Sequence, residues 1–321
     1  MTEEMIQSKQ VLDENIPQAE NKEAPCKKGF FKKIFRTQEG LIWKAVAFPI
    51  LLIWSLSLIY PFVWAFINSF KTPAEYLKNS FSLPEVWRFS NWVTAFTALE
   101  VPLTNPIETA NMFDMIFNSI WWMAGTVIFS NCVTIGMAYA LAKYKYKIGK
   151  FLYTMNLVIM TIPIVGAFPA QYSLYKSLGI MNTPFMLLTS LGCLGSANLM
   201  LYYSYFKNIS WTYAEAVFVD GGGHWTVFLR VMIPQAMPII SALVILACIA
   251  SWNDYFTALV YLTDFPTLAT GLYRMSVSST LARNMPVYFA AVLWSVLPMI
   301  VLFAVFSDKI MTSVSIGGIK G

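Results

Sequence analysis

The sequence is poor in charged side chains. Asp, Glu, Lys and Arg make up 12% of its 321 residues, whereas 57% of the residues are hydrophobic. A soluble globule of this length needs more charge to cover its surface, so the composition excludes an ordinary soluble protein. We predict an all-α, polytopic membrane protein instead.

The residue types that carry most enzyme chemistry are also scarce. His224 is the only histidine, and the four cysteines form no C-x-x-C pair. A lone histidine cannot build a histidine-based metal or haem site, and the sequence contains no G-x-x-x-x-G-K-[ST] phosphate loop. We therefore expect no catalytic residue, no metal site and no cofactor in this chain. His224 is interpreted as a solvent-facing loop residue, and the cysteines as reduced packing or tail residues.

Six long stretches contain no Asp, Glu, Lys or Arg. Each has about 20 residues or more, which is the length that an α-helix needs to cross a hydrocarbon core about 30 Å thick. Their continuous apolar character favours helices over the alternating strands of a barrel. The six predicted spans are Ala45–Ile67, Ile116–Ala142, Phe151–Gln171, Pro184–Phe206, Ala236–Trp252 and Val287–Phe306.

Basic residues are distributed unevenly among the connections between these spans. Of the 22 Lys and Arg, 16 lie before the first span, in the second and fourth connections and after the last span, and six lie in the other connections. The positive-inside rule then places both termini and the Lys143–Lys150 connection in the cytoplasm, and parity places Trp211–Pro234 there too. Topology therefore explains the positive net charge, and nucleic-acid binding is not required.

Two regions outside the spans have distinct compositions. Residues 1–40 are predicted to be a cytoplasmic tail, disordered over 1–29 because few apolar residues are present to form a core. Its basic, Phe-containing end either lies on the membrane as a short helix or simply flanks the first span. Residues 41–321 are predicted to form one membrane domain. Its long outer connection, 68–115, allows short membrane-embedded helices, a docking surface or a lid.

A polar, glycine-centred interruption separates the fourth and fifth spans, and we call residues Trp211–Pro238 the Glu215 loop. Trp211–Val219 contains neither Pro nor Gly, which predicts a short helix. The glycines Gly221–Gly223 predict a turn, and a second helix is expected from His224 with Asp220 as its cap. The loop is thus predicted to be a helix, a tight turn and a second helix.

One face of the first helix of the Glu215 loop is small and mostly apolar. The residues at three- and four-residue spacing on it are Tyr213, Ala216, Val217 and Asp220. Beyond the membrane such a face has no lipid to bury against, so it predicts a protein partner, to which Glu215 could add an ionic contact. Packing against the chain's own spans is the alternative. Pro234 and Pro238 are expected to mark the start of the fifth span.

The Glu215 loop resembles the EAA motif of type I ABC importer permeases, which lies between the fourth and fifth of six spans. Two positions depart from it: Val217 stands where a second Ala is usual, and Gly222 where Ala is common. The resemblance implies contacts with a separate cytoplasmic ATPase dimer that binds ATP and Mg, with Glu215 pairing to an Arg. The implied contact residues are Glu215, Ala216, Asp220, Gly221, Gly222 and Pro234.

Other segments resemble the carbohydrate-uptake permeases related to the maltose transporter. They are Asn68–Lys71, Ser82–Pro84, Phe89–Trp92, Phe117–Ser119, Trp252–Asp254 and Gly317–Gly321. The last of these resembles the tail of the second of two dissimilar permease subunits, which implies ATPase contacts from Gly317, Gly318 and Lys320. The resemblance also implies a second permease subunit, an extracytoplasmic sugar-binding protein and membrane lipid as partners, no nucleic acid, and a bacterial plasma membrane.

Polar and aromatic side chains in or beside the spans are the candidates for contact with a sugar. They are Asn131, Asn156, Asn198, Trp252, Asn253 and Asp254. Sugars are held by stacking and by amide or carboxylate hydrogen bonds, but Asn also ties helices together and Trp also populates the interfacial belt. An importer of a non-sugar solute and an ion-coupled carrier are the alternative functions. The carrier is disfavoured because the predicted spans lack ionisable side chains.

Overall fold

The computed structural model describes residues 38–105, 107–162, 166–278 and 284–317, with the backbone alone for 38–45 and 307–317. The chain divides into two units, Met1–Pro61 and Phe62–Gly321. The tail predicted over residues 1–40 lies almost wholly outside the described residues, and so do Gly318 and Lys320.

Helix α3 (Gln38–Ser69) begins in the first unit and ends in the second. Its Val46–Ser69 part is long and apolar enough to cross a membrane, which confirms the first predicted span as one helix. Between Val46 and Tyr60 almost every large apolar side chain is exposed in the structure. A helix that is apolar on all sides belongs in lipid or against another protein.

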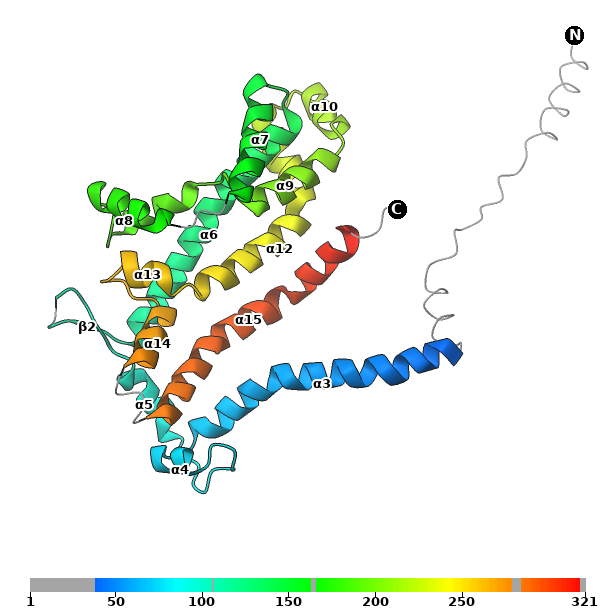
Figure 1. The fold of residues 1–321 in the computed structure, drawn as a ribbon. Helices are drawn as coiled ribbons and strands as arrows, with labels where there is room; N and C mark the ends of the chain where they lie inside the picture. Colours follow the sequence, from blue (N-terminus) through cyan, green and yellow to red (C-terminus); the bar gives the residue numbers. More distant parts are fainter. Residues whose placement is uncertain (1–37, 106, 163–165, 279–283, 318–321) are drawn as a thin grey trace, which may run out of the picture. The chain divides into compact units, whose positions relative to one another are not determined.

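The second unit is almost entirely helical, and Figure 1 shows its elements in sequence colours. The helices are α4 (Pro73–Lys78), α5 (Ser90–Ala98), α6 (Met112–Lys143), α7 (Lys147–Thr161), α8 (Ala167–Ser177), the 3-10 helix η1 (Pro184–Leu191), α9 (Ala197–Asn208), α10 (Thr212–Val219), α11 (His224–Thr226), the π-helix η2 (Val227–Met232), α12 (Ile233–Trp252), α13 (Phe256–Tyr261), α14 (Leu268–Val277) and α15 (Met285–Gly317). Two short antiparallel strands, β1 (Val101–Pro102) and β2 (Thr109–Ala110), pair Val101 with Ala110.

The all-α fold class is confirmed, and four of the described helical stretches are long and apolar enough to cross a membrane. They are Val46–Ser69, Met112–Lys143, His224–Trp252 and Met285–Phe306. These match the first, second, fifth and sixth predicted spans. The predicted third and fourth spans are each divided in two, so neither is the single continuous helix that hydropathy suggested.

Proline and glycine explain both divisions. The third predicted span consists of α7 and α8. Ile162, which precedes Pro163 in the sequence, has an extended backbone (φ −80°, ψ 116°), as expected because a proline disfavours helical geometry in the residue before it. The fourth span consists of η1 and α9, separated at 192–196, where Gly195 has a positive φ of 81°. Apolar composition alone does not reveal such breaks.

The fifth span begins earlier than predicted, at His224 instead of Ala236. Pro234 lacks the N–H that would bond to the carbonyl of Arg230, and its ring needs room in the preceding turn. The π-helical turn η2 precedes that proline, and the widened turn supplies the room. The helical stretch therefore begins before both prolines, although Pro234 lies in the first turn of α12 and Pro238 lies inside that helix.

Helix α6 is central to the second unit, since it contacts α9, α12, η1 and α14. With 32 residues it is about 48 Å long, so its ends extend beyond a hydrocarbon core about 30 Å thick. Figure 1 shows α5 and α14 at its Met112 end and α7 and α10 at its Lys143 end. A separate buried apolar cluster packs at each end, around Met112 and around Tyr139.

The connection predicted over 68–115 contains α4, α5 and the β1–β2 hairpin. Hydrogen bonds within it join the segments Asn68–Lys71 and Phe89–Trp92. The Asn91 amide donates to the carbonyl oxygens of Ser69 (2.8 Å) and Lys71 (2.9 Å), and the Trp92 indole donates to the Ser69 hydroxyl (3.0 Å). Lys71 is fully buried and donates to the Asn79 carbonyl. Buried polar groups that are paired in this way fix a loop firmly.

Candidate functional site

Helix α10, the first helix of the Glu215 loop, has a buried side and an exposed side. Ala214 is fully buried, and Val217 and Phe218 pack against the cluster around Tyr139. Glu215 and Ala216 are exposed, and so is Val219. The sequence left two alternatives for this loop, packing against the chain's own spans or contact with a partner protein. The inner side of α10 packs on this chain, and its outer side remains exposed, so the two alternatives are each met in part.

The predicted small apolar face is partly wrong. Tyr213, Ala216 and Asp220 are exposed, but Val217 is half-buried and packs inward. Residues 213, 216, 217 and 220 span a broad arc of the helix, so one edge of that arc turns towards the core. The exposed surface comprises Thr212, Tyr213, Glu215, Ala216, Val219 and Asp220.

The turn after α10 is a Schellman motif, in which two backbone N–H groups close the helix end. Gly221 donates to Phe218 (3.0 Å) and Gly222 donates to Val217 (2.8 Å). Gly221 has a φ of 80°, which glycine adopts without strain. Asp220 sits at the end of α10, and Gly223 occupies the position before α11 with no side-chain cap. The prediction that Asp220 caps the second helix is therefore wrong.

The two departures from the EAA pattern lie in contact. A Cβ atom on Gly222 would come within 2.5 Å of Val217 Cγ1 and 3.0 Å of the Val217 carbonyl oxygen. The distance to Cγ1 is too short for two real carbon atoms, so valine at 217 favours glycine at 222, whereas the contact with the backbone oxygen is tight whatever residue stands at 217. Val217 and Gly222 are thus a matched pair.

The Glu215 carboxylate has no bonding partner within the described part of the chain. It lies in the first turn of α10, where the unpaired N–H groups favour a negative charge. Pro234 is exposed near the start of α12, and Gly317 is the last described residue of α15. An exposed carboxylate on a helix whose other side is buried can pair with a cation from a partner without any rearrangement of the chain's own contacts.

A polar groove of about 530 Å³ lies between the helices of the second unit, and we refer to it as the polar groove. Its lining is Trp122, Thr126, Val127, Ser130, Thr189, Ser190, Asn198, Ala247, Ala250, Ser251, Asp254 and Thr257. Six of these twelve residues carry hydroxyl groups, and the hydroxyls of Thr126 on α6 and Ser251 on α12 are hydrogen-bonded to each other at 2.9 Å. Hydroxyls, one amide, one carboxylate and one indole form a lining that suits a polyhydroxylated ligand.

Two of the six predicted sugar-contact residues line the polar groove. Asn198 is half-buried, and within the described residues its side-chain amide has no hydrogen-bond partner. Asp254 accepts hydrogen bonds from the backbone N–H (3.1 Å) and the hydroxyl of Thr257. Both could therefore offer free hydrogen-bonding capacity to a solute.

The other four predicted residues do not line this groove. Asn131 accepts from the Tyr202 hydroxyl (2.7 Å). The Asn156 side-chain oxygen accepts from the Gly195 N–H (2.7 Å), which satisfies the backbone at the break between η1 and α9. The Trp252 indole donates to the Ser295 carbonyl, and Asn253 donates to a carbonyl of its own helix. Each therefore has a hydrogen-bond partner within this chain, although Asn253 itself is exposed.

The sequence reasoning missed the hydroxyl-bearing residues of the polar groove. A signal was present, because Trp122, Thr126 and Ser130 recur every four residues along α6 and so share one helix face. The threonine and serine also bond to carbonyls in their own helix, as such residues often do in spans. Composition alone cannot distinguish a Ser or Thr that only bonds to its own helix from one that also lines a groove.

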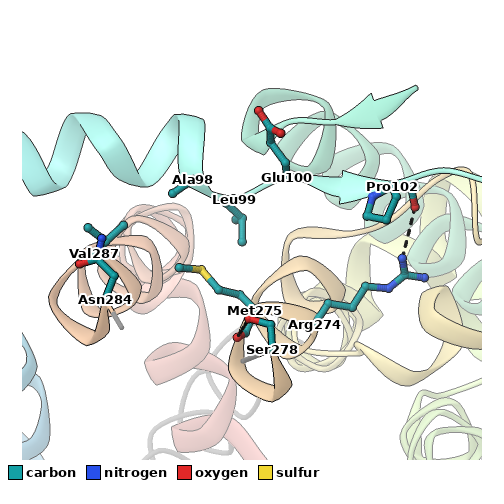
Figure 2. A pocket seen from close by; sticks show the side chains of 9 residues that line it. All are labelled: Ala98, Leu99, Glu100, Pro102, Arg274, Met275, Ser278, Asn284 and Val287. Carbon is teal, nitrogen blue, oxygen red and sulfur yellow. Dashed lines mark hydrogen bonds between the residues drawn. The ribbon is translucent and has the colours of Figure 1, made fainter. Parts of the chain in front are cut away.

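A second pocket, of about 300 Å³, lies at the Met112 end of the unit, between α5 and β1 on one side and α14 and α15 on the other. Figure 2 shows Arg274 reaching the Pro102 carbonyl, to which it donates at 3.4 Å, while the Glu100 carboxylate points away from it. Ser278 and Asn284 add further polar groups. This pocket is remote from the Glu215 loop, which contacts the other end of α6.

Asp264 joins three segments near the β1–β2 hairpin. Its carboxylate accepts from the Thr104 N–H (2.6 Å) and from the Asn182 amide, and its own N–H donates to Asn182 Oδ1 (2.7 Å). The hydrogen bonds from Thr104, with a smaller contribution from Asn182, hold the pKa of Asp264 below its ordinary value. Asp264 is therefore a charged junction between the hairpin, the residues after α8 and those before α14.

The fold and these surfaces define a multi-pass α-helical membrane protein with a polar groove and an exposed helix-turn-helix loop. The chain belongs to the family described as the inner membrane component of binding-protein-dependent transport systems, whose family model matches residues 131–312, more than half of the chain. The matched residues include the Glu215 loop and most of the polar groove.

Relatives and solved structures agree with this family. The chain is 28% identical over 276 residues to the diacetylchitobiose uptake system permease protein NgcG of Streptomyces coelicolor, covering 85% of this chain and 88% of that protein. It is 24% identical to the arabinooligosaccharides transport system permease protein AraQ of Halalkalibacterium halodurans, covering 82% and 91%. A bacterial ABC transporter involved in alginate import shares the fold, with a TM-score of 0.71 and 22% identity over 85% of this chain and 98% of that one.

Proposed function

We propose that this chain is the membrane-spanning permease subunit of an ATP-driven importer for a sugar or oligosaccharide. It supplies half of the translocation pathway, and the polar groove between α6, α9 and α12 is the solute-facing part of that half. The hydroxyl-rich lining of the groove and the saccharides in the names of its relatives support this substrate class. A second, dissimilar permease subunit and an external sugar-binding protein complete the pathway.

The Glu215 loop is the proposed docking surface for a separate ATPase dimer in the cytoplasm, where ATP and Mg bind. The observation that carries this proposal is the exposed Glu215 carboxylate, which has no partner among the described residues and lies on a helix that is anchored by Ala214 and Phe218. Gly317, Gly318 and Lys320 at the chain end are proposed as additional ATPase contacts. Both termini then lie in the cytoplasm of a bacterial cell, with membrane lipid around the spans.

Charge reversal at Glu215 tests this function. In the reconstituted complex we expect Glu215→Arg to abolish sugar-stimulated ATP hydrolysis and uptake, because it places two cations opposite each other. Glu215→Gln, which keeps the size and loses the charge, should retain a reduced activity. Membrane insertion should match the unmodified chain in both variants. Full stimulated hydrolysis by the Glu215→Arg variant would refute the docking role.

A further inference from the structure

The end of α6 is followed by a tandem pair of residue types, Lys143-Tyr144-Lys145-Tyr146. The two pairs have different surroundings. Lys143 and Tyr144 are half-buried and hydrogen-bonded to other segments. Lys145 and Tyr146 are exposed, and no group in the described part of the chain bonds to their ammonium or hydroxyl groups. The chain therefore contains an engaged pair and a free pair of the same composition.

The engaged pair reaches both ends of the segment that carries Glu215. The Lys143 ammonium donates to the carbonyl of Ile209, which lies just before α10. The Tyr144 hydroxyl is hydrogen-bonded to Nδ1 of His224 at 2.9 Å, just after the glycine turn. Two consecutive residues of one helix end thus hold the beginning and the end of Ile209–His224.

Aromatic contacts add orientation to these hydrogen bonds. The Tyr144 ring meets Trp211 edge-on at 5.9 Å and His224 at 5.6 Å between ring centroids. The His224 ring also contacts Phe218 of α10 at 5.0 Å. Edge-on ring pairs favour particular angles, so these contacts restrict tilting of the loop as well as its distance from α6. His224 is exposed, as the sequence suggested, and it also makes structural contacts with Tyr144 and Phe218.

We propose that Lys143 and Tyr144 form a two-point clasp that fixes Ile209–His224 to the end of α6, so that displacement of Glu215 moves α6. The clasp rests on the proposed ATPase docking role of Glu215. The groove-lining residue Ser130 lies 13 positions before Lys143 on the same helix, about 20 Å along its axis. A loop held at both ends passes displacement to the helix, whereas a loop held at one end can bend.

Amide hydrogen exchange tests the clasp without any partner chain. The full chain in lipid nanodiscs would be compared as Lys143→Met, Tyr144→Phe and the double variant, with Lys145→Met and Tyr146→Phe as matched controls. Losing a hydrogen bond should speed exchange of the α10 amides by about two- to tenfold. The controls, which remove the same charge and the same hydroxyl, should leave it unchanged. Equal exchange in clasp variants and controls would overturn the proposal, and Tyr144→Phe decides the matter if Lys143→Met fails to insert.

Coupling in the reconstituted complex gives a second, functional readout. We expect the clasp variants to hydrolyse ATP but to transport about two- to tenfold less solute per ATP, while both controls match the unmodified complex. An unmodified complex that shows no solute-dependent hydrolysis would refute the proposed function. If ATP hydrolysis is coupled to solute transport in the unmodified complex and equally coupled in the clasp variants, the clasp is refuted and the proposed function stands.

Discussion

The segments that precede α6 and the loop that packs on its far end both depend on polar contacts, but the contacts face in opposite directions. Near α4 and α5, the side chains of Asn91 and Lys71 are buried and donate hydrogen bonds to backbone carbonyls of this chain. At the other end, Lys143 and Tyr144 hold a loop whose Glu215 carboxylate stays exposed and unpaired within the described residues. In the first region these buried donors bond within this chain, and in the second the Glu215 carboxylate is left to contact something else.

Removing the Asn91 amide should damage the internally completed region most. Asn91→Ala leaves the buried carbonyls of Ser69 and Lys71 without their side-chain donor, so we expect the free energy of unfolding to fall by about 2–4 kcal/mol. Thermal unfolding of the purified protein in detergent measures it. Asn208→Ala, at an exposed position, should change it by less than about 0.5 kcal/mol. Equal stability of the two variants would show that the buried contacts do not hold this region.

The glycine turn of the Glu215 loop gives the next largest effect. Gly222→Ala should cost about 1–3 kcal/mol because its Cβ would overlap Val217. Combining it with Val217→Ala should recover part of that loss, because the overlap with Cγ1 disappears while the tight contact with the carbonyl oxygen of residue 217 remains. A double-mutant cycle on thermal stability measures the coupling. If Gly222→Ala leaves the thermal stability unchanged while Val217 is retained, the contact between these two positions does not contribute to stability.

Buried and groove-lining polar residues should separate in their effects on stability and transport. Tyr202→Phe leaves the Asn131 oxygen unpaired and should cost about 0.5–2 kcal/mol of stability with little change in uptake. Asn198→Ala should leave stability nearly unchanged and lower the rate of solute uptake, because its amide lines the polar groove. Thermal unfolding and uptake by proteoliposomes check the pair. The reverse assignment of effects would contradict the position of the solute pathway.

The smallest effect concerns Asp264 and pH. Because its pKa is depressed in the folded chain, its contacts stabilise the hairpin above the ordinary Asp value of about 4, and this contribution is lost as pH falls through the depressed pKa. The protection of the β1–β2 amides, which is their exchange rate relative to the intrinsic rate at the same pH, should therefore fall below about pH 4. Asp264→Asn should lack this step, and an identical acid response in that variant would show that Asp264 does not link the hairpin.

Local sequence predicted the features that local physics determines. Four spans followed from apolar length, and α10 with its turn followed from a Pro- and Gly-free stretch before Gly221. The breaks near Pro163 and Gly195 were missed, because a single breaker inside an apolar run hardly changes its mean hydropathy. Asn156 sits beside one of those breaks and satisfies it from 39 residues away, which no local pattern reveals.

The site was predicted in its exposed part and not in its buried contacts. Glu215, Ala216 and Asp220 are on the surface, as the motif requires, whereas the inward orientation of Val217 depends on the core cluster around Tyr139. The contact of Tyr144 with His224 joins residues 80 positions apart, so sequence spacing cannot suggest it. The groove hydroxyls come from four helical elements, α6, η1, α12 and α13, and only the assembly of these elements shows that Asn198 and Asp254 belong together.

Site-specific photo-crosslinking in the assembled transporter tests the central claim most directly. A photoreactive residue would replace either Val219 on the Glu215 loop, which is 88% exposed, or Phe81 in the connection before α5, which is 77% exposed. We expect Val219 to form an adduct with the ATPase and Phe81 to form none. An ATPase adduct from Phe81 and none from Val219 would contradict both the side of the membrane and the partner assigned to the Glu215 loop.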